Sequence, residues 1–193
     1  MCVIYKCRSS DEQNKNLENK RKMGFSIFEI NKDGEYATQQ YVVDFAEYNL
    51  SIGINTDGAL GIDVGKIYHS KERILIGYDC TLVWLATRPV VEIVKEHKFT
   101  SYFFEFMPLD NTDEVIVISE IEVARINIFG DVIWSIYAAD IITYFNIIGS
   151  FLYLQFFEDT IENMKVDLLT GKVEKLGTRP HLDAGYYDNN KED

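Results

Sequence analysis

Short runs of β-branched and aromatic residues follow one another along most of the chain, and turn residues separate them. Such side chains pack well on a pleated surface, so each run predicts a strand. Asp-Gly and other Gly-containing pairs between the runs supply the positive φ that tight hairpins need. The pattern predicts a mainly β fold, as an antiparallel β-meander, a sandwich or propeller-like blades, with at most one or two short helices. The predicted strands are 25–30, 73–78, 81–86, 101–106, 114–118, 132–137 and 150–157, and the turn signals include Asp33-Gly34, Asp57-Gly58, Gly130-Asp131, Gly149-Ser150 and Thr170-Gly171.

Helical signals are few. Residues 87–98 predict a helix, because Thr87 is a candidate N-cap, Pro89 suits the first turn, and Val90, Ile93 and Val94 share one face. A strand entered through a proline turn is the alternative for this stretch. Residues 8–22 contain one aliphatic side chain, Leu17, and are interpreted as a flexible arm or a frayed polar helix.

The patterned sequence divides the chain into three parts. We predict a flexible polar arm over residues 1–22, a single β domain over 23–176 and a polar acidic tail over 177–193. Met1 and Met23 are both candidate start codons, since the strand pattern begins at Met23. The chain has no signal-peptide pattern and no apolar run of spanning length, which predicts a cytoplasmic protein with reduced thiols.

Two similar segments of the sequence carry a resemblance to a known family. Residues 126–132 are followed, 41 residues later, by 167–173, with a glycine turn between apolar strands in each case. The segment from Val166 to Val173, together with Gly130 to Trp134, resembles the strand–turn–strand of quinoprotein-like (PQQ-type) and related propeller repeats. The resemblance covers about residues 112–176 and implies four-stranded, propeller-like units. No cofactor is predicted from it.

Charge limits the classes of partner. The formal net charge is −12 with a pI of about 4.7, which repels nucleic-acid backbones and anionic membranes, so neither is a predicted partner. The charge is concentrated between the two terminal parts, where 12 Tyr and 12 Phe in the whole chain supply contact area. Such a domain favours an acidic, Tyr-rich face for a basic protein partner. A solvated acidic surface that only keeps the protein soluble is the alternative.

No catalytic motif stands out. The chain contains no G-x-S-x-G, no P-loop and no H-E-x-x-H, and its three histidines are scattered singly. Cys2 and Cys7 are spaced as half of a metal site, but no second pair exists, so no metal is predicted. The acidic loop from Asp110 to Glu114 lacks the glycine and the distal glutamate of a calcium-binding EF-hand loop.

These observations favour a non-enzymatic acidic binding protein, and an immunity-type inhibitor that neutralises a basic enzyme is its sharpest form. One alternative is a hydrolase or carbohydrate-active β domain with paired carboxylates. Another is a structural subunit that forms oligomers through an apolar strand edge, since 151–157 is apolar on both faces. The candidate partner-binding residues are Asp110, Asp113, Glu114, Trp134, Tyr137, Glu158 and Asp159.

Overall fold

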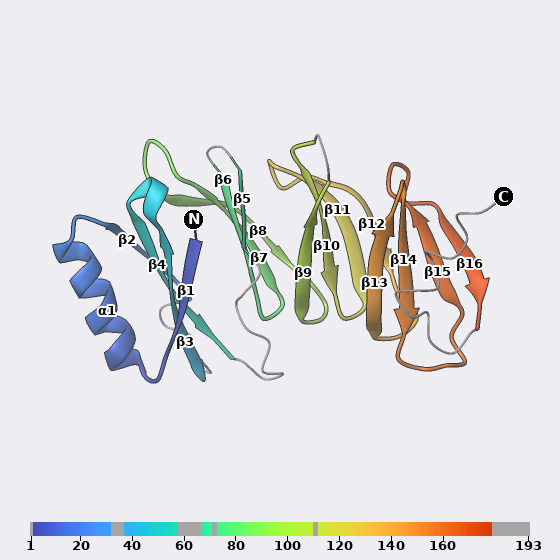
Figure 1. Cartoon of the computed structure of the whole chain (residues 1–193), viewed down its shortest axis with the longest axis horizontal. Helices are drawn as coiled ribbons and strands as arrows, with labels where there is room; N and C mark the ends of the chain where they lie inside the picture. The colour runs from blue at the N-terminus through green and yellow to red at the C-terminus, as the bar shows by residue number, and fades with distance from the viewer. Residues whose placement is uncertain (1, 32–36, 58–66, 71–72, 110–111, 179–193) are drawn as a thin grey trace. The chain divides into compact units, whose positions relative to one another are not determined.

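A computed structural model of the chain describes residues 2–31, 37–57, 67–70, 73–109 and 112–178. The expected mainly β fold is confirmed, with four four-stranded sheets and one α-helix in this part of the chain (Figure 1). The chain divides into two compact units, residues 1–106 and 107–193. No helix in the described ranges has the length and apolar character needed to cross a membrane. The Asp33-Gly34 turn signal, Asp110 and nearly all of the acidic tail lie outside the described residues.

The first sheet of unit 1 differs from the other three sheets. Its strands are β1 (Cys2–Cys7), β2 (Ser26–Ile30), β3 (Gln39–Phe45) and β4 (Leu50–Thr56), in the order β1-β3-β4-β2. β3 is antiparallel to β1 and β4, whereas β2 runs parallel to β4. A short 3₁₀ helix, η1 (Ala46–Tyr48), joins β3 to β4 and ends at Asn49, whose φ is 48°. Asn tolerates this left-handed conformation better than most residues.

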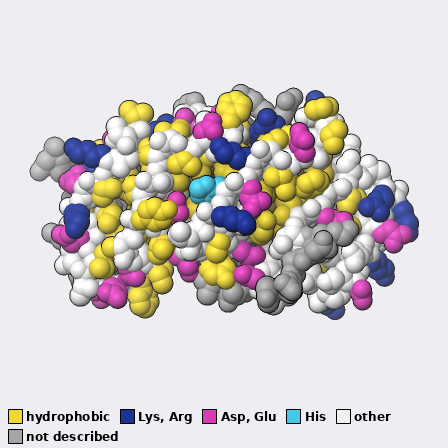
Figure 2. Space-filling view, turned by 180° about the vertical axis from the view of Figure 1, so that it is seen from behind, with side chains coloured by type: hydrophobic (Ala, Val, Ile, Leu, Met, Phe, Trp, Pro, Cys, Tyr) yellow, Lys and Arg dark blue, Asp and Glu magenta, His cyan; other side chains and the backbone are white. Residues whose placement is uncertain are grey.

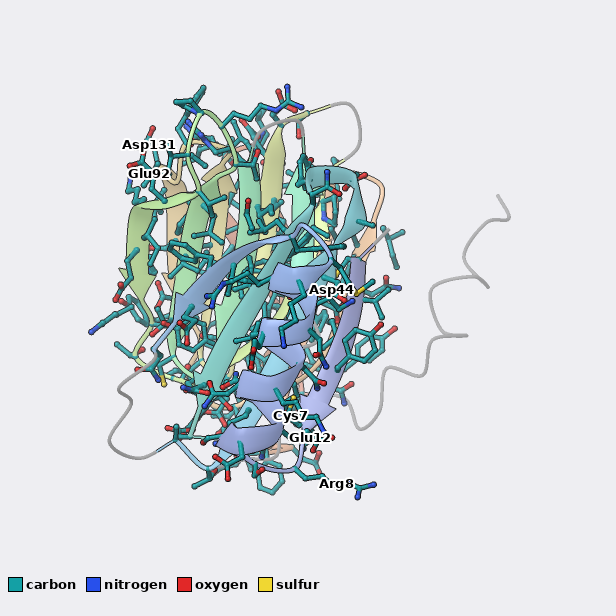
Figure 3. The ribbon with its side chains drawn as sticks, turned by 90° about the vertical axis from the view of Figure 1, so that its left-hand side faces the viewer. Cys7, Arg8, Glu12, Asp44, Glu92 and Asp131 are labelled. Atoms are coloured by element: carbon teal, nitrogen blue, oxygen red, sulfur yellow. The ribbon has the colours of Figure 1, made fainter. Side chains whose placement is uncertain are left out.

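The stretch interpreted as an arm or a frayed helix forms α1 (Ser10–Lys22), which packs on the first sheet. Figure 3 looks onto this helix with the strands of its sheet behind it. Ser9 caps the helix by accepting a 3.2 Å hydrogen bond from the Glu12 amide, and basic residues in the last turn complement the helix dipole.

Two buried side chains of α1 attach it to the sheet. Leu17 packs with Cys7 and Val42. The side-chain nitrogen of Gln13, Nε2, donates hydrogen bonds to the backbone carbonyls of Tyr41 and Ile54, at 2.8 and 3.2 Å. Residues 2–22 are therefore part of the folded unit rather than an arm, because tertiary contacts supply the burial that the local sequence lacks.

The second sheet is an antiparallel meander of β5 (Ile67–Ser70), β6 (Arg73–Tyr78), β7 (Thr81–Ala86) and β8 (Glu92–Lys98). It shares a core with the first sheet. The members of this core are Ile30, Tyr41, Val43, Phe45, Leu50, Ile52, Ile54, Ile74, Ile76, Val83 and Leu85. Leu75 and Trp84, which alternate with core residues along their strands, are also fully buried, so β6 and β7 are apolar on both faces.

The predicted helix over 87–98 is wrong, because most of this stretch is the strand β8. β8 pairs with β7 along its length, and this pairing satisfies backbone groups of β7 that a helix would leave unpaired. The apolar face proposed for the helix finds no core. Val90, Ile93 and Val94 are 68%, 42% and 43% exposed.

Two further meanders follow. One contains β9 (Phe103–Pro108), which spans the boundary between the units, β10 (Glu114–Ser119), β11 (Glu122–Asn127) and β12 (Val132–Tyr137). The other contains β13 (Ile142–Ile148), β14 (Phe151–Phe156), β15 (Asn163–Asp167) and β16 (Val173–Gly177). The two similar segments, 126–132 and 167–173, form the turns between the third and fourth strands of these consecutive sheets. Gly130 and Gly171 have φ values of 81° and 70° in these turns.

Replacing Leu17 by Ala tests whether α1 is part of the fold. The side chain is 4% exposed, and truncation of a buried leucine costs about 2–5 kcal/mol. Urea unfolding should show a loss in that range, whereas Lys15→Ala on the exposed side of α1 should change stability by less than about 0.5 kcal/mol. Equal, small effects of both substitutions would mean that the helix is not docked.

Candidate functional site

Three loops meet at one end of the strands in unit 2. They are the β10–β11 turn, the β12–β13 loop and the β14–β15 loop, and Figure 1 shows the last two at the same lower end of their strands. The amides of Ala138 and Ile142 donate to the carbonyls of Ile121 and Glu120, at 2.8 and 2.7 Å. The Phe157 amide donates to the Ile141 carbonyl at 2.9 Å. The loops are therefore joined by backbone hydrogen bonds.

Side-chain hydrogen bonds fix all three of these loops further. The Glu158 amide donates to Oδ2 of Asp140 at 2.7 Å, which ties the β14–β15 loop to the β12–β13 loop. In the β10–β11 turn, the Ser119 hydroxyl accepts from the Glu122 amide at 3.1 Å and donates to the Glu122 carbonyl at 3.2 Å. These contacts hold the loop backbones in one arrangement.

The side chains that these loops present are acidic and apolar. Segments 119–122, 137–142 and 157–162 contain no Lys or Arg. Tyr137, Ile141 and Phe157 are 62%, 42% and 70% exposed, although large apolar side chains are usually buried. We call this surface the acidic–aromatic patch, and it consists of Glu120, Tyr137, Asp140, Ile141, Phe157, Glu158 and Asp159.

Figure 2 shows one side of the molecule, on which acidic, basic and hydrophobic side chains are intermixed. Lys175 on β16 pairs with Glu162, at the end of the β14–β15 loop, with an Nζ–Oε2 distance of 2.8 Å. Glu162 is therefore partly neutralised and is left out of the patch.

The structure separates the predicted partner-binding residues into two groups. Tyr137, Glu158 and Asp159 come together in the acidic–aromatic patch. Asp113 and Glu114 lie at the opposite end of the strands, since Glu114 begins β10. Sequence reasoning missed the other four patch residues, Glu120, Asp140, Ile141 and Phe157. The available signal was the alternation of a meander, in which every second loop returns to the same end of the sheet.

Glu114 forms an internal ion pair rather than part of a surface. Nε of Arg125, whose side chain is largely buried, donates to Oε2 of Glu114 at 2.7 Å, and Nη2 contacts the same oxygen. Nη1 of Arg125 donates to the carbonyl oxygens of Leu168 and Leu169, at 2.7 and 3.3 Å. Arg125 therefore joins its own sheet to the β15–β16 turn, with Glu114 balancing its charge.

Trp134 takes part in the same junction. Its indole Nε1 donates to the Leu168 carbonyl at 3.0 Å, and its ring lies so close to Gly171 that a Cβ at this position would stand 2.7 Å from Cγ of the indole. The residue is half-buried on β12. These contacts show that Trp134 packs between its own sheet and the β15–β16 turn of the next sheet.

One groove, on the last sheet, contains two carboxylates. Its volume is ≈ 540 Å³ and its lining residues are Phe151, Lys165, Asp167, Thr170, Lys172, Val173 and Glu174. A general acid in a hydrolase needs a raised pKa. Hydrogen bonds from the Thr170 hydroxyl and amide instead lower the pKa of Asp167. Glu174 pairs with Lys165 at 3.1 Å. The groove therefore does not supply the acid that the hydrolase interpretation requires.

The cysteines and the acidic groups do not form a metal centre in the described parts of the chain. No cluster there brings together three His, Cys, Asp or Glu side chains in a metal-binding arrangement. Cys7 lies buried under α1, and its Sγ accepts a hydrogen bond from the side-chain nitrogen of Asn16, Nδ2, at 3.7 Å. Burial raises the pKa of its thiol, which disfavours the reactive thiolate.

Comparisons with known proteins found similar solved structures only. No family model and no curated protein matches it. It is similar to the computationally designed Ika4 protein, with a TM-score of 0.46 and 16% identity over 63% of this chain and 73% of that chain. BamB from Moraxella catarrhalis gives a TM-score of 0.47 and 10% identity over 72% and 47% of the two chains. The WD40 domain of Pan2 from Neurospora crassa gives 0.43 and 15% identity over 63% and 40%.

The chain therefore spans less than half the length of BamB and of the Pan2 domain that it matches. These neighbours assign no family and no activity to the chain.

Gly171→Ala and Gly149→Ala form a matched pair that tests the junction of Trp134 with the β15–β16 turn. Both glycines have positive φ, 70° and 60°, but a Cβ would meet Trp134 at Gly171 and nothing within 4 Å at Gly149. The backbone strain alone costs about 1–2 kcal/mol, and displacing the packed indole adds about 1–3 kcal/mol. Urea unfolding should show the larger loss for Gly171→Ala. Equal losses would contradict this packing.

Glu122, next to the patch on β11, predicts a pH dependence of stability. The residue is 3% exposed, and burial raises the pKa of its carboxyl. Between the ordinary and the raised pKa the folded chain binds a proton that the unfolded chain has lost, so stability falls as the pH rises through this interval.

Glu122→Gln should therefore be more stable than the unchanged chain at neutral pH. The gain should shrink as the pH falls towards the ordinary value for glutamate, about 4.3. Chemical unfolding at a series of pH values measures the difference. A gain that is the same at every pH would show that the charge of Glu122 is not its cause.

Proposed function

We propose that this chain is a binding module whose acidic–aromatic patch engages a basic protein partner. The observation that supports the proposal is that three segments without Lys or Arg are joined by hydrogen bonds. They contain Asp140, Glu158 and Asp159 together with the exposed Tyr137 and Phe157. Acidic clusters alone are common on soluble proteins. Large aromatic side chains exposed among them are characteristic of interaction surfaces.

The two kinds of side chain have different roles in binding. The carboxylates attract a basic surface over a distance of about 8–10 Å at moderate salt and so increase the rate of encounter. Tyr137 and Phe157 then supply the apolar contact area that holds the complex together. An interface of this kind loses association rate when salt is raised, while its apolar contacts keep dissociation slow.

Hydrogen bonds between the loops pre-organise the proposed binding surface. Backbone hydrogen bonds link Ile121 to Ala138 and Ile141 to Phe157, and the Asp140 carboxylate holds the Glu158 amide. A surface already held in one arrangement gives up little conformational entropy on association. The patch therefore supports binding without a large change of shape.

Inhibition of a basic enzyme is the narrowest form of the proposal. A carboxylate surface competes with an anionic substrate for the same cationic cleft, because both are attracted by the same charges. The position of the aromatic side chains supports this role, since exposed Tyr137 ends β12 and exposed Phe157 follows β14.

Charge reversal at the patch tests the proposal against a matched control. Glu158→Lys/Asp159→Lys should lower the association rate with a basic protein captured from native lysate by about 10-fold at low salt. Asp113→Lys/Asp131→Lys makes the same change of net charge at exposed positions of unit 2 away from the patch, and should lower the rate by less than about 3-fold. Biolayer interferometry at low and high salt measures both rates.

The control decides between a site and bulk charge. Equal losses in the two double variants would mean that net charge alone attracts the basic protein, and would overturn the assignment of the patch. Tyr137→Ala/Phe157→Ala should leave the association rate near its original value and increase the dissociation rate, because the aromatic contacts form after encounter.

A further inference from the structure

The last sheet has one face that is only partly buried. Along β14, Leu152, Leu154 and Phe156 are buried, whereas the alternating residues on the other face are half-exposed. Strand register places residues of the neighbouring strands on the same face. We call it the open face, and it contains Tyr144, Asn146, Ile148, Phe151, Tyr153, Gln155, Lys165, Asp167 and Glu174.

The corresponding face of the preceding sheet is covered. Arg125 and Lys165 occupy equivalent places, because each lies on the third strand of its meander, two residues before the residue that opens the turn, Asn127 or Asp167. Arg125 is covered by the β15–β16 turn and donates to its carbonyl oxygens. The place that receives this turn in one sheet is thus the groove over Lys165 in the next.

The contacts of Lys165 stay within its own sheet. Its Nζ lies 4.3 Å from the centre of the Phe151 ring and 3.1 Å from Oε2 of Glu174. These contacts hold the ammonium group at the floor of the groove, with Lys172, Asp167 and Val173 also lining it. The groove therefore combines an aromatic ring with both signs of charge.

We propose that the open face binds the open face of a second copy of this chain in a two-fold dimer. The groove has two lysines, Lys165 and Lys172, and two carboxylates, Asp167 and Glu174, so it is neutral in a chain whose net charge is −12. A two-fold axis brings the same surface of both copies together, which requires the surface to be self-complementary. A groove with equal numbers of both charges meets this requirement without the repulsion that the acidic surface elsewhere would cause.

Phe151 and Tyr153 supply the apolar area of this interface, and the cross-pairing of lysines and carboxylates sets its register. The dimer surface is the face of a sheet, whereas the acidic–aromatic patch lies on the loops at the ends of strands. The two proposals therefore rest on different residues, and either can fail without the other.

Sedimentation velocity of the full chain over a wide range of protein concentrations tests the dimer. The mass should rise from monomer to dimer with concentration. Phe151→Glu should remain monomeric throughout that range, while Phe129→Glu should dimerise like the unchanged chain. Phe129 is 66% exposed on the β11–β12 turn and lies outside the open face. Far-UV circular dichroism confirms that both variants are folded.

A charge-swap series tests the register. Lys165→Glu places a third carboxylate in the groove and should raise the dimer dissociation constant by at least about 10-fold. Lys165→Glu/Glu174→Lys restores the balance of charges and should bring the constant back to within about 3-fold of the original. A purely structural role of the Lys165–Glu174 pair would change unfolding without changing the mass.

Three outcomes would overturn the proposal. They are a full chain that stays monomeric at every concentration, a dimer unaffected by Phe151→Glu, and a chain that dimerises only after residues 179–193 are removed. The last result would show that this segment, rather than a second copy, occupies the open face.

Discussion

The strands of this protein carry more apolar surface than one face of a sheet can hold, and that surface has to be kept from water. β6, β7, β10 and β11 are buried along almost their whole length, as in sheets with both faces covered. The first sheet has a cover of its own, because α1 packs on it through Leu17 and Gln13. Both faces of these four strands are therefore used for packing.

The two proposed binding surfaces, at the ends of strands and on the last sheet, use side chains that these four strands do not bury. The acidic–aromatic patch is built from loops, whose side chains are not needed for the core. The loops that carry its carboxylates and aromatic rings are joined by hydrogen bonds, because alternate loops of a meander return to the same end. The open face of β13–β16 is a second proposed surface, and the balanced charges of its groove support a different proposed partner from that of the patch.

Buried polar contacts within unit 2 involve two of the predicted partner-binding residues. Glu114 and Trp134 have the residue types of a binding site, but both serve Arg125 and the β15–β16 turn. The carbonyls of Leu168 and Leu169 gain donors in this way, and the guanidinium gains a counter-charge. Removal of Glu114 would leave a largely buried charge without its partner, which is a defect of folding rather than of recognition.

The strands marked by glycine or aspartate turns could be predicted from the sequence. The ranges 73–78, 81–86 and 132–137 match β6, β7 and β12 residue for residue. In these ranges the strand-forming composition and the flanking turn residues predict the same boundaries. Helix and strand were confused at 87–98, where pairing with β7 outweighed a local helical pattern. Residues 10–22 gave no apolar stripe, and only the contacts of Gln13 and Leu17 explain why they are ordered as a helix.

The candidate site could be predicted from the sequence only in part. Tyr137, Glu158 and Asp159 were predicted from residue type, and the meander brings their segments to the same end of the strands. Asp140 and Phe157 were missed, because their proximity depends on which loops share an end of the sheet. Composition alone could not separate these residues from Glu114, whose carboxylate is occupied by Arg125.

Hydrogen–deuterium exchange of the chain with and without a basic protein captured from native lysate tests the central claim most directly. Bound protein should slow exchange in segments 137–142 and 157–162 and leave β1 and α1 unchanged. Protection confined to α1 or to the face of β13–β16, or no protection at all at saturating partner, would contradict the assignment of the acidic–aromatic patch as the binding site.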